Sequence, residues 1–215
     1  MCLPKCQGGM GFRDIKLFNL AMLGKQGWRL MVAPDSLCAR VLKGKYFHNC
    51  DFMSARKKKN ASHTWRAILA GRKVLQLGCI RRIGDGNDTN IWNDQWLPGG
   101  VGMKPLCRKG EAIAEQVSEL LSPDSLSWND GALEQNLVLL DAEAAKRIPL
   151  GRSMTDSWAW SGERHRMYTV KSGYHLLAAS EAQQRDFMQR RATHSNHVAD
   201  PRWKQLWKCK VPPKV

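Results

Sequence analysis

The stretch "TWRAILAGRKVLQLGCIRRIGDGNDTNIWNDQWLP", residues 64–98, decides the fold, because a helical repeat in it gives way to turn and strand residues. Ser62 or Thr64 can cap a helix that begins here, and Gly78 can end it. The apolar residues of this helix recur at helical spacing and predict a buried side made of Trp65, Ile68, Leu69 and Leu75.

The second part of the same stretch predicts a β-hairpin near residues 80–92. Ile80 and Ile83 flank two arginines, and "GDGND" supplies turn residues that tolerate positive φ. "TNIW" adds β-branched and aromatic side chains, and Pro98 ends the unit.

Two further helices are predicted on the N-terminal side of this stretch. The apolar positions of the first are Leu20, Leu23, Gly27, Leu30 and Met31, with Trp28 beside them. Pro34 stops it, and Asp35 or Ser36 caps the next. The inner face expected for that second helix is Leu37, Val41, Leu42 and Tyr46. A loop that carries Arg56, Lys57, Lys58 and Lys59 follows.

The second half of the chain alternates short elements. Helices are predicted over 111–121, 132–140 and 141–148, and "DSWAWS" and "YTV" predict a short antiparallel strand pair. Ser172 is the expected cap of the helix "GYHLLAAS". The polar composition of residues 181–200 indicates a linker, although "SEAQQRDFMQRR" could extend the preceding helix.

These elements define an α+β fold that is mainly helical, with the hairpin near 80–92 and the strand pair near 157–170. Four segments are expected along the chain. They are a basic helical connector at 1–110, a small α+β unit at 111–180, the polar linker at 181–200, and a C-terminal segment at 201–215.

The charge of the chain is concentrated in its first half. The whole chain has a formal charge of +15, and residues 1–110 hold 20 basic against 6 acidic residues, a net +14. Such a surface is suited to a polyanion, so nucleic acid is the expected partner, and a merely soluble basic surface is the alternative. The phosphate contacts expected from charge are Arg56, Lys57, Lys58, Lys59, Arg81 and Arg82.

The possible metal ligands do not match known site patterns. Asp85, Asp88 and Asp94 lack the glycine and glutamate spacing of a calcium loop, and a turn explains them better. His194, His197 and Cys209 provide too few ligands for a closed zinc site. No nucleophile elbow, Walker loop or dinucleotide fingerprint occurs, so no catalytic residue, cofactor or small-molecule substrate is expected.

An intracellular, reducing environment is expected, in the nucleus or the cytoplasm. No run of 18 apolar residues occurs, and "MCLPKCQGGMGF" is no signal peptide. The seven cysteines are scattered without a CxxC pair, which does not suggest a disulfide framework.

Nine tryptophans are many for this length, and core packing is their default role. Stacking of a nucleobase beside Trp65 and Arg66 is the alternative. The tryptophans expected on buried faces are Trp65, Trp92, Trp158 and Trp160.

Several blocks resemble, in order, the segment that follows the polymerase domain in plant LINE-type (non-LTR) retrotransposon polyproteins. They are "CLPKCQGGMGFRDIKLFNLAMLGKQGWRL", "VLKGKYF", "TWRAILAGRKVLQLG", "RRIGDGNDTNIWNDQWLP" and "YTVKSGYHLL". The closing "WKQLWKCKVPPKV" is similar to the start of the reverse transcriptase zinc-binding domain. The resemblance extends over nearly the whole chain and is weakest at residues 103–150 and in the linker.

The resemblance implies that the polymerase aspartates and the ribonuclease H centre lie outside this chain, and that Met1 is an internal methionine. The expected function is therefore a non-catalytic fragment that at most contacts nucleic acid non-specifically. Trp203, Leu206 and Trp207 share one helical face and are expected to dock on the remainder of the polyprotein. A scaffold segment and an unselected remnant are the alternatives.

Overall fold

The computed structural model describes residues 12–98, 101–110, 113–123, 127–151 and 155–192. The residues of the tail that were considered lie outside them. These are His194, His197 and Cys209, which were weighed and rejected as a zinc site, and the expected docking residues Trp203, Leu206 and Trp207. The α+β, mainly helical class is confirmed: six α-helices accompany one two-stranded sheet in the described part of the chain. No helix there is long and apolar enough to cross a membrane.

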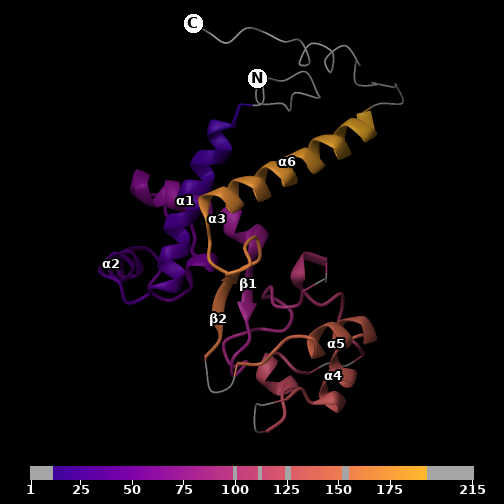
Figure 1. Ribbon diagram of the computed structural model, residues 1–215. Coiled ribbons are helices and arrows are strands. Elements are labelled where there is room, and N and C mark those ends of the chain that lie inside the picture. The colour runs from indigo at the N-terminus through magenta and orange to yellow at the C-terminus, as the bar shows by residue number, and fades with distance from the viewer. Residues whose placement is uncertain (1–11, 99–100, 111–112, 124–126, 152–154, 193–215) are drawn as a thin grey trace, which may run out of the picture.

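One core is built by α1 (Ile15–Val32), α2 (Leu37–Tyr46), α3 (His63–Gly78) and α6 (Val170–Ala192). In Figure 1 these helices form the upper part of the molecule. We call residues 12–82 and 155–192 the helical unit. The helix starts follow the expected local chemistry, because Ser36 accepts from the Ala39 N–H and Ser62 accepts from the Trp65 N–H.

The inner face expected for α2 is partly wrong. Leu37 and Val41 are 76% and 58% exposed, whereas Ala39 and Tyr46 are buried. The reason is the contact between α2 and α3. The ring of Tyr46 stacks on that of Trp65 in α3, with the two ring centroids 4.8 Å apart. The face that carries Ala39 and Tyr46 therefore points inward.

Trp65 is the centre of an aromatic cluster. Its ring stacks with that of Tyr46, lies 5.3 Å from that of Phe47, and has Phe52 at its edge. Trp65 is 0% exposed, so its ring is already covered on the inside of the protein. The alternative in which Trp65 stacks on a nucleobase is therefore wrong, and the expected core role is correct.

The single sheet replaces both of the expected local strand pairs. β1 (Cys79–Arg82) pairs antiparallel with β2 (Ser157–Trp160), so that Cys79 lies opposite Trp160 and Arg82 opposite Ser157. The hairpin near 80–92 and the pair near 157–170 are therefore wrong as pairings, although a strand lies in each region. Tyr168 does not pair; its buried hydroxyl donates to the Ala21 carbonyl at 2.7 Å.

The buried carboxylate of Asp156 explains why "GDGND" does not close a hairpin. Its Oδ1 accepts from the N–H groups of Gly84 and Gly86 at 2.7 and 3.0 Å. Its Oδ2 accepts from the Asp88 N–H and the Thr89 hydroxyl at 3.2 and 2.5 Å. The loop 84–89 therefore surrounds the side chain of Asp156, which directly precedes β2. It does not turn the chain back to pair with β1.

Residues 83–151 form a second core, which we call the loop-rich unit. Its helices are the single turns η3 (Val101–Met103) and η4 (Val117–Leu120), followed by α4 (Asp130–Asn136) and α5 (Leu139–Lys146). In Figure 1 it forms the lower part of the molecule. Its largest fully buried side chains are Ile83, Ile91, Trp96, Leu97, Leu120, Leu133 and Leu137.

The helix expected over 111–121 is reduced to the one turn η4. Gln116 and Leu121 on either side of it form isolated antiparallel bridges with Asn90 and Trp128, so the backbone at both ends is extended. The two helices expected after residue 132 are confirmed as α4 and α5, separated at Leu137 and Val138. The two cores divide the chain differently from the expected segments 1–110 and 111–180, and that division into segments stays a prediction.

The start and end of α6 differ from the simplest expectation. The Thr169 hydroxyl, not Ser172, accepts from the N–H in the first turn, and the Ser172 hydroxyl instead accepts from the Trp160 indole N–H at 2.9 Å. At its other end α6 continues to Ala192. The first part of the expected linker 181–200 is therefore helical, which is the alternative that the sequence left open.

Candidate nucleic-acid interface

Folding separates the charges of the chain more sharply than the linear halves suggest. The helical unit carries 22 basic against 7 acidic residues, a net +15, whereas residues 83–151 carry 5 basic against 11 acidic, a net −6. Because β2 and α6 belong to the helical unit, almost all of the excess positive charge of the described residues lies on one side of the structure. A polyanion is attracted to that side and repelled by the other.

The loop that carries Arg56, Lys57, Lys58 and Lys59 is held at both ends and exposed between them. Ala55 and Ala61 are buried at its two ends, while all four cationic side chains are exposed. None of the ion pairs found among the described residues involves these four. This anchored loop can therefore present four cations to phosphates.

Arg72 of α3 anchors the N-terminal end of this loop, a role that was not predicted from the sequence. Its Nη1 donates to the carbonyls of Phe52, Met53 and Ala55 at 3.3, 3.0 and 2.6 Å. Nothing in the spacing of the sequence distinguishes Arg72 from the exposed basic residues nearby, because its partners lie 17 to 20 residues earlier. Because its guanidinium is used in these hydrogen bonds, Arg72 stabilises the loop and is not added to the candidate phosphate contacts.

The two candidate arginines of β1 have different surroundings. The Arg81 guanidinium lies over the Trp158 ring, 3.9 Å from its centroid, and its Nε is buried without a hydrogen-bond partner among the described residues. Arg82 is exposed. Arg82 is therefore the better placed phosphate contact, whereas the cation–π contact restrains Arg81.

Trp158 of β2 lies beside Arg81 and also near the segment that precedes the cationic loop. With Met53, Cys50 and Phe47 it lines a small cavity of about 80 Å³ in the helical unit. The strand with Arg81 and the segment before Arg56 thus border the same part of the surface. The structure does not bring the six candidate cations into one closed site, which fits a diffuse electrostatic surface better than a specific pocket.

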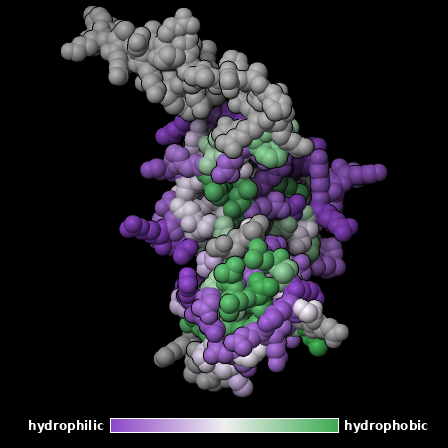
Figure 2. Space-filling model, turned by 90° about the vertical axis from the view of Figure 1, so that its right-hand side faces the viewer, coloured by the Kyte–Doolittle hydropathy of each residue, from purple (hydrophilic) through white to green (hydrophobic). Residues whose placement is uncertain are grey.

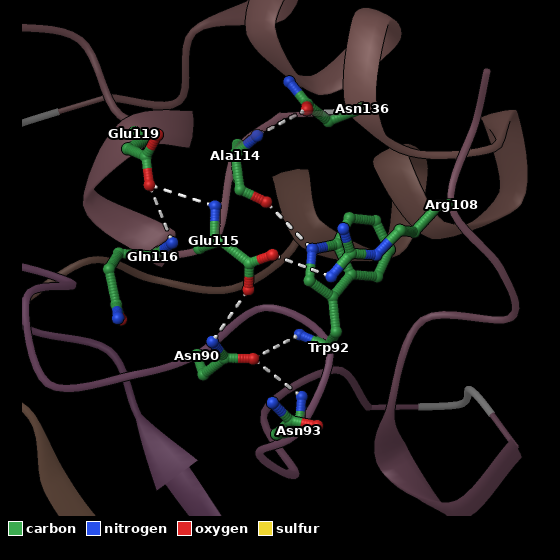
Figure 3. Close-up of polar contacts among 9 residues, drawn as sticks. All are labelled: Asn90, Trp92, Asn93, Arg108, Ala114, Glu115, Gln116, Glu119 and Asn136. Carbon is green, nitrogen blue, oxygen red and sulfur yellow. Dashed lines mark hydrogen bonds and ion pairs between the residues drawn. The ribbon is translucent and has the colours of Figure 1, made fainter. Parts of the chain in front are cut away.

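A polar cluster in the loop-rich unit was not anticipated (Figure 3). The Arg108 guanidinium donates to Glu115 at 2.8 Å and lies 4.9 Å from the centroid of the Trp92 ring. Asn90 donates to the other carboxylate oxygen of Glu115 at 3.2 Å. The hydrogen bond from Arg108, followed by that from Asn90, lowers the pKa of Glu115.

Neighbouring contacts show that this cluster is structural. Glu119 accepts from the N–H groups of Glu115 and Gln116, and the Trp92 indole N–H donates to the Ala114 carbonyl. Glu119 thus orders residues 115 and 116, while the bonds from Asn90 to Glu115 and from Trp92 to Ala114 connect residues 90–93 to residues 114–119. The arrangement leaves no carboxylate paired with a second one for acid–base chemistry.

The acidic residues considered for a metal are dispersed. Asp85 accepts from the Asn87 N–H, and Asp94 accepts from the Asn90 N–H. Within the described ranges, no three His, Cys, Asp or Glu side chains are grouped so that they could hold a metal ion. Cys79 is buried, which raises the pKa of its thiol to about 12.

Comparison with known proteins gives two plant relatives. The chain is 39% identical over 99 residues to an Arabidopsis thaliana protein named "Uncharacterized mitochondrial protein"; the match covers 46% of this chain and 64% of that protein. It is 30% identical over 234 aligned positions to an Arabidopsis thaliana protein named "Putative ribonuclease H protein", covering 100% of this chain and 34% of that protein.

The chain is therefore related to plant proteins, and it spans less than two thirds of the length of both relatives. No protein-family profile matches the chain. No solved structure matches it significantly.

Proposed function

We propose that this chain is a non-catalytic segment of a plant LINE-type retroelement polyprotein, and that it contacts nucleic acid without sequence specificity through the helical unit. The observation that carries the nucleic-acid part is the separation of charge, +15 on the helical unit against −6 on the loop-rich unit. Phosphate contacts from exposed Lys and Arg supply most of non-specific binding.

The origin in a retroelement is supported by two lines. The order of blocks from "QGGMGF" to "YTVKSGYHLL" resembles the region after the polymerase in such polyproteins. The relative named for ribonuclease H aligns with the whole chain but is far longer, so this chain corresponds to one part of it. The remaining part of such a protein is where we place polymerase and ribonuclease H chemistry.

Binding to RNA or DNA is expected to weaken steeply with salt. If about four to six phosphates are neutralised, the log–log slope of the association constant against salt concentration is roughly −3 to −5. Replacing Lys57, Lys58 and Lys59 with alanine is expected to make this slope shallower by about 2 to 3. Fluorescence anisotropy with a labelled RNA between low and physiological salt measures it.

A matched control removes three positive charges from the other unit. Lys104→Ala, Lys109→Ala and Arg147→Ala together change the net charge equally but lie in the loop-rich unit. We expect the parent slope for this variant. An unchanged slope in the loop variant, or a flat salt response of the parent chain, would contradict the proposed interface.

The purified chain is expected to show neither primer extension nor cleavage of an RNA–DNA hybrid. Both reactions use divalent metals held by clustered carboxylates. Poly(A) with an oligo(dT) primer, and a labelled hybrid, each with Mg²⁺, test this. Product that depends on this chain, and that disappears on mutation of it, would show that the non-catalytic assignment is wrong.

A protein-docking segment is the second candidate, and one observation favours it. Leu139 and Leu140 at the start of α5 are 73% and 74% exposed, and Ile113 is 86% exposed. Figure 2 shows hydrophobic atoms gathered over the part of the surface where the loop-rich unit lies. An uncovered apolar patch of this kind is typical of a contact surface.

Leu139→Ser with Leu140→Ser tests the docking candidate. Reduced self-association in sedimentation velocity, with unchanged affinity for RNA, would favour docking through this patch. Unchanged self-association would exclude the two leucines from such a contact.

A further inference from the structure

A cleft lies between α1 and α6, apart from the cationic loop and the β1 arginines considered for phosphate contact. It has a volume of about 320 Å³ and is lined by Phe18 and Met22 of α1, by Val170 and Tyr174 of α6, and by the basic side chains of Arg13, Lys171 and His175. Phe18, Val170 and Tyr174 are half-buried, whereas Lys171 and His175 are exposed. Apolar and aromatic groups therefore meet basic side chains at one opening.

The aromatic side chains of the cleft are held in place. The rings of Phe18 and Tyr174 meet edge to face with centroids 6.5 Å apart, and those of Tyr174 and His175 do so at 5.7 Å. The Tyr174 hydroxyl also accepts from the Asp14 N–H at 3.1 Å. A preformed aromatic wall loses little conformational entropy when a flat ligand binds to it.

Contacts of Tyr168, two residues before α6, hold the start of that helix against α1. The Lys25 ammonium donates to the Tyr168 carbonyl at 2.7 Å, and the Tyr168 hydroxyl donates to the Ala21 carbonyl. Tyr168 itself is buried, which raises the pKa of its hydroxyl. The cleft is consequently a feature of the folded helix pair and does not depend on a single loop.

The charge around the cleft favours an anionic ligand. Asp14 is the acidic residue next to Arg13, and its carboxylate accepts from the N–H groups of Lys16 and Leu17 as the cap of α1. Lys171 and His175 lie one turn apart on α6, and the whole helical unit has a net charge of +15. A neutral apolar peptide would make no use of the positive charge of Lys171.

We infer that this cleft binds an unpaired base of single-stranded nucleic acid, with the base against the Tyr174 and His175 rings and the adjoining phosphate beside Lys171. Aromatic rings next to cations are the common means of binding single strands, because every base has a face to stack and every nucleotide has a phosphate. This inference rests on the proposed function and adds to it a preference for unpaired bases.

The test compares ligands that have the same phosphates but different bases. Labelled single-stranded RNA, single-stranded DNA, a duplex and an abasic DNA strand, all of one length, are titrated by anisotropy at one salt concentration. The single strands are expected to bind at least about fivefold more tightly than the abasic strand. The RNA and DNA arms show whether the 2′-hydroxyl contributes.

Three variants distinguish the contribution of the base to the affinity from that of the phosphate. Tyr174→Leu keeps an apolar group beside Phe18 but removes the ring, and His175→Leu removes an exposed ring that contacts the Tyr174 ring. Each is expected to reduce the ratio of single-stranded to abasic affinity by about fivefold. Lys171→Ala is expected to weaken both affinities and to leave that ratio unchanged.

The outcomes distinguish this inference from the proposed function. Absence of binding to every nucleic acid would overturn both. Binding to all four ligands with equal affinity, or an affinity ratio that neither Tyr174→Leu nor His175→Leu alters, would overturn the base-binding cleft and leave the electrostatic interface standing. The latter result is also the one expected if the cleft receives a peptide.

Discussion

Replacing Asp156 with alanine is expected to lower the free energy of unfolding by about 3–4 kcal/mol, because each hydrogen bond to a charged acceptor contributes roughly 1.5–3 kcal/mol and buried donors left unpaired are costly. Four donors meet this one carboxylate, which is 9% exposed. Once it is removed, three backbone N–H groups and the Thr89 hydroxyl lose their acceptor. The loop 84–89 then loses the side chain that organises it.

Two further variants at this loop make the result interpretable. Asp156→Asn keeps one acceptor oxygen but replaces the other with a donor, so we expect about half of the loss. Asp85→Ala removes a carboxylate of the same loop that accepts, among the described residues, from the Asn87 N–H, and it is expected to cost less than about 1 kcal/mol. Urea unfolding followed by tryptophan fluorescence measures all three. A loss below about 1 kcal/mol for Asp156→Ala would show that the loop is held by other contacts.

Gly71→Ala is expected to destabilise the chain by about 3 kcal/mol or slightly more, the upper end of the usual cost of overpacking. A Cβ at this position would lie 2.5 Å from the backbone nitrogen of Gly24 and 2.5 Å from the carbonyl carbon of Leu23. Both are main-chain atoms of α1, which cannot rotate away as a side chain can. The whole of α1 would have to move away from α3.

The same substitution elsewhere is expected to have the opposite sign. Gly44 lies in α2, where an added Cβ meets nothing within 4 Å. Alanine is better than glycine in a helix by about 1 kcal/mol, so Gly44→Ala is expected to stabilise the protein by roughly 0.5–1 kcal/mol. Gly71→Ala gains the same propensity and is still destabilising only if the backbone clash outweighs it. Equal effects at the two positions would show that α1 and α3 do not touch at Gly71.

Local signals account for the parts of the fold that were predicted correctly. The apolar repeat of α3 and its cap Ser62 lie within one helix, as do the repeat of α1 and the stop at Pro34. Such features depend on residues three or four positions apart, so the sequence contains all the information that they need. The charge of the chain also follows directly from its sequence, and residues 56–59 form the exposed loop that their composition predicted.

Most of the incorrect and missed features depend on partners far along the chain. β1 pairs with β2 across 70 or more residues, and the "GDGND" turn is organised by Asp156, which lies 67 to 72 residues after its donors. Arg81 and Arg82 are equivalent in the sequence, but in the structure the Trp158 ring lies beside Arg81. The cleft of Phe18, Tyr174 and His175 likewise joins the first helix to the last.

By itself the sequence determined the helical character of the chain, the ends of its first three helices and the sign of its charge, because these follow from neighbouring residues and composition. Only the tertiary structure decided which strand pairs with β1, which of the cations are exposed, and how the positive charge separates from the negative. Each of these depends on a buried contact between distant segments, such as the carboxylate of Asp156 in its loop or Gly71 against Gly24. Such contacts form only because the packed protein leaves no other partner for the buried polar groups and no room for a side chain.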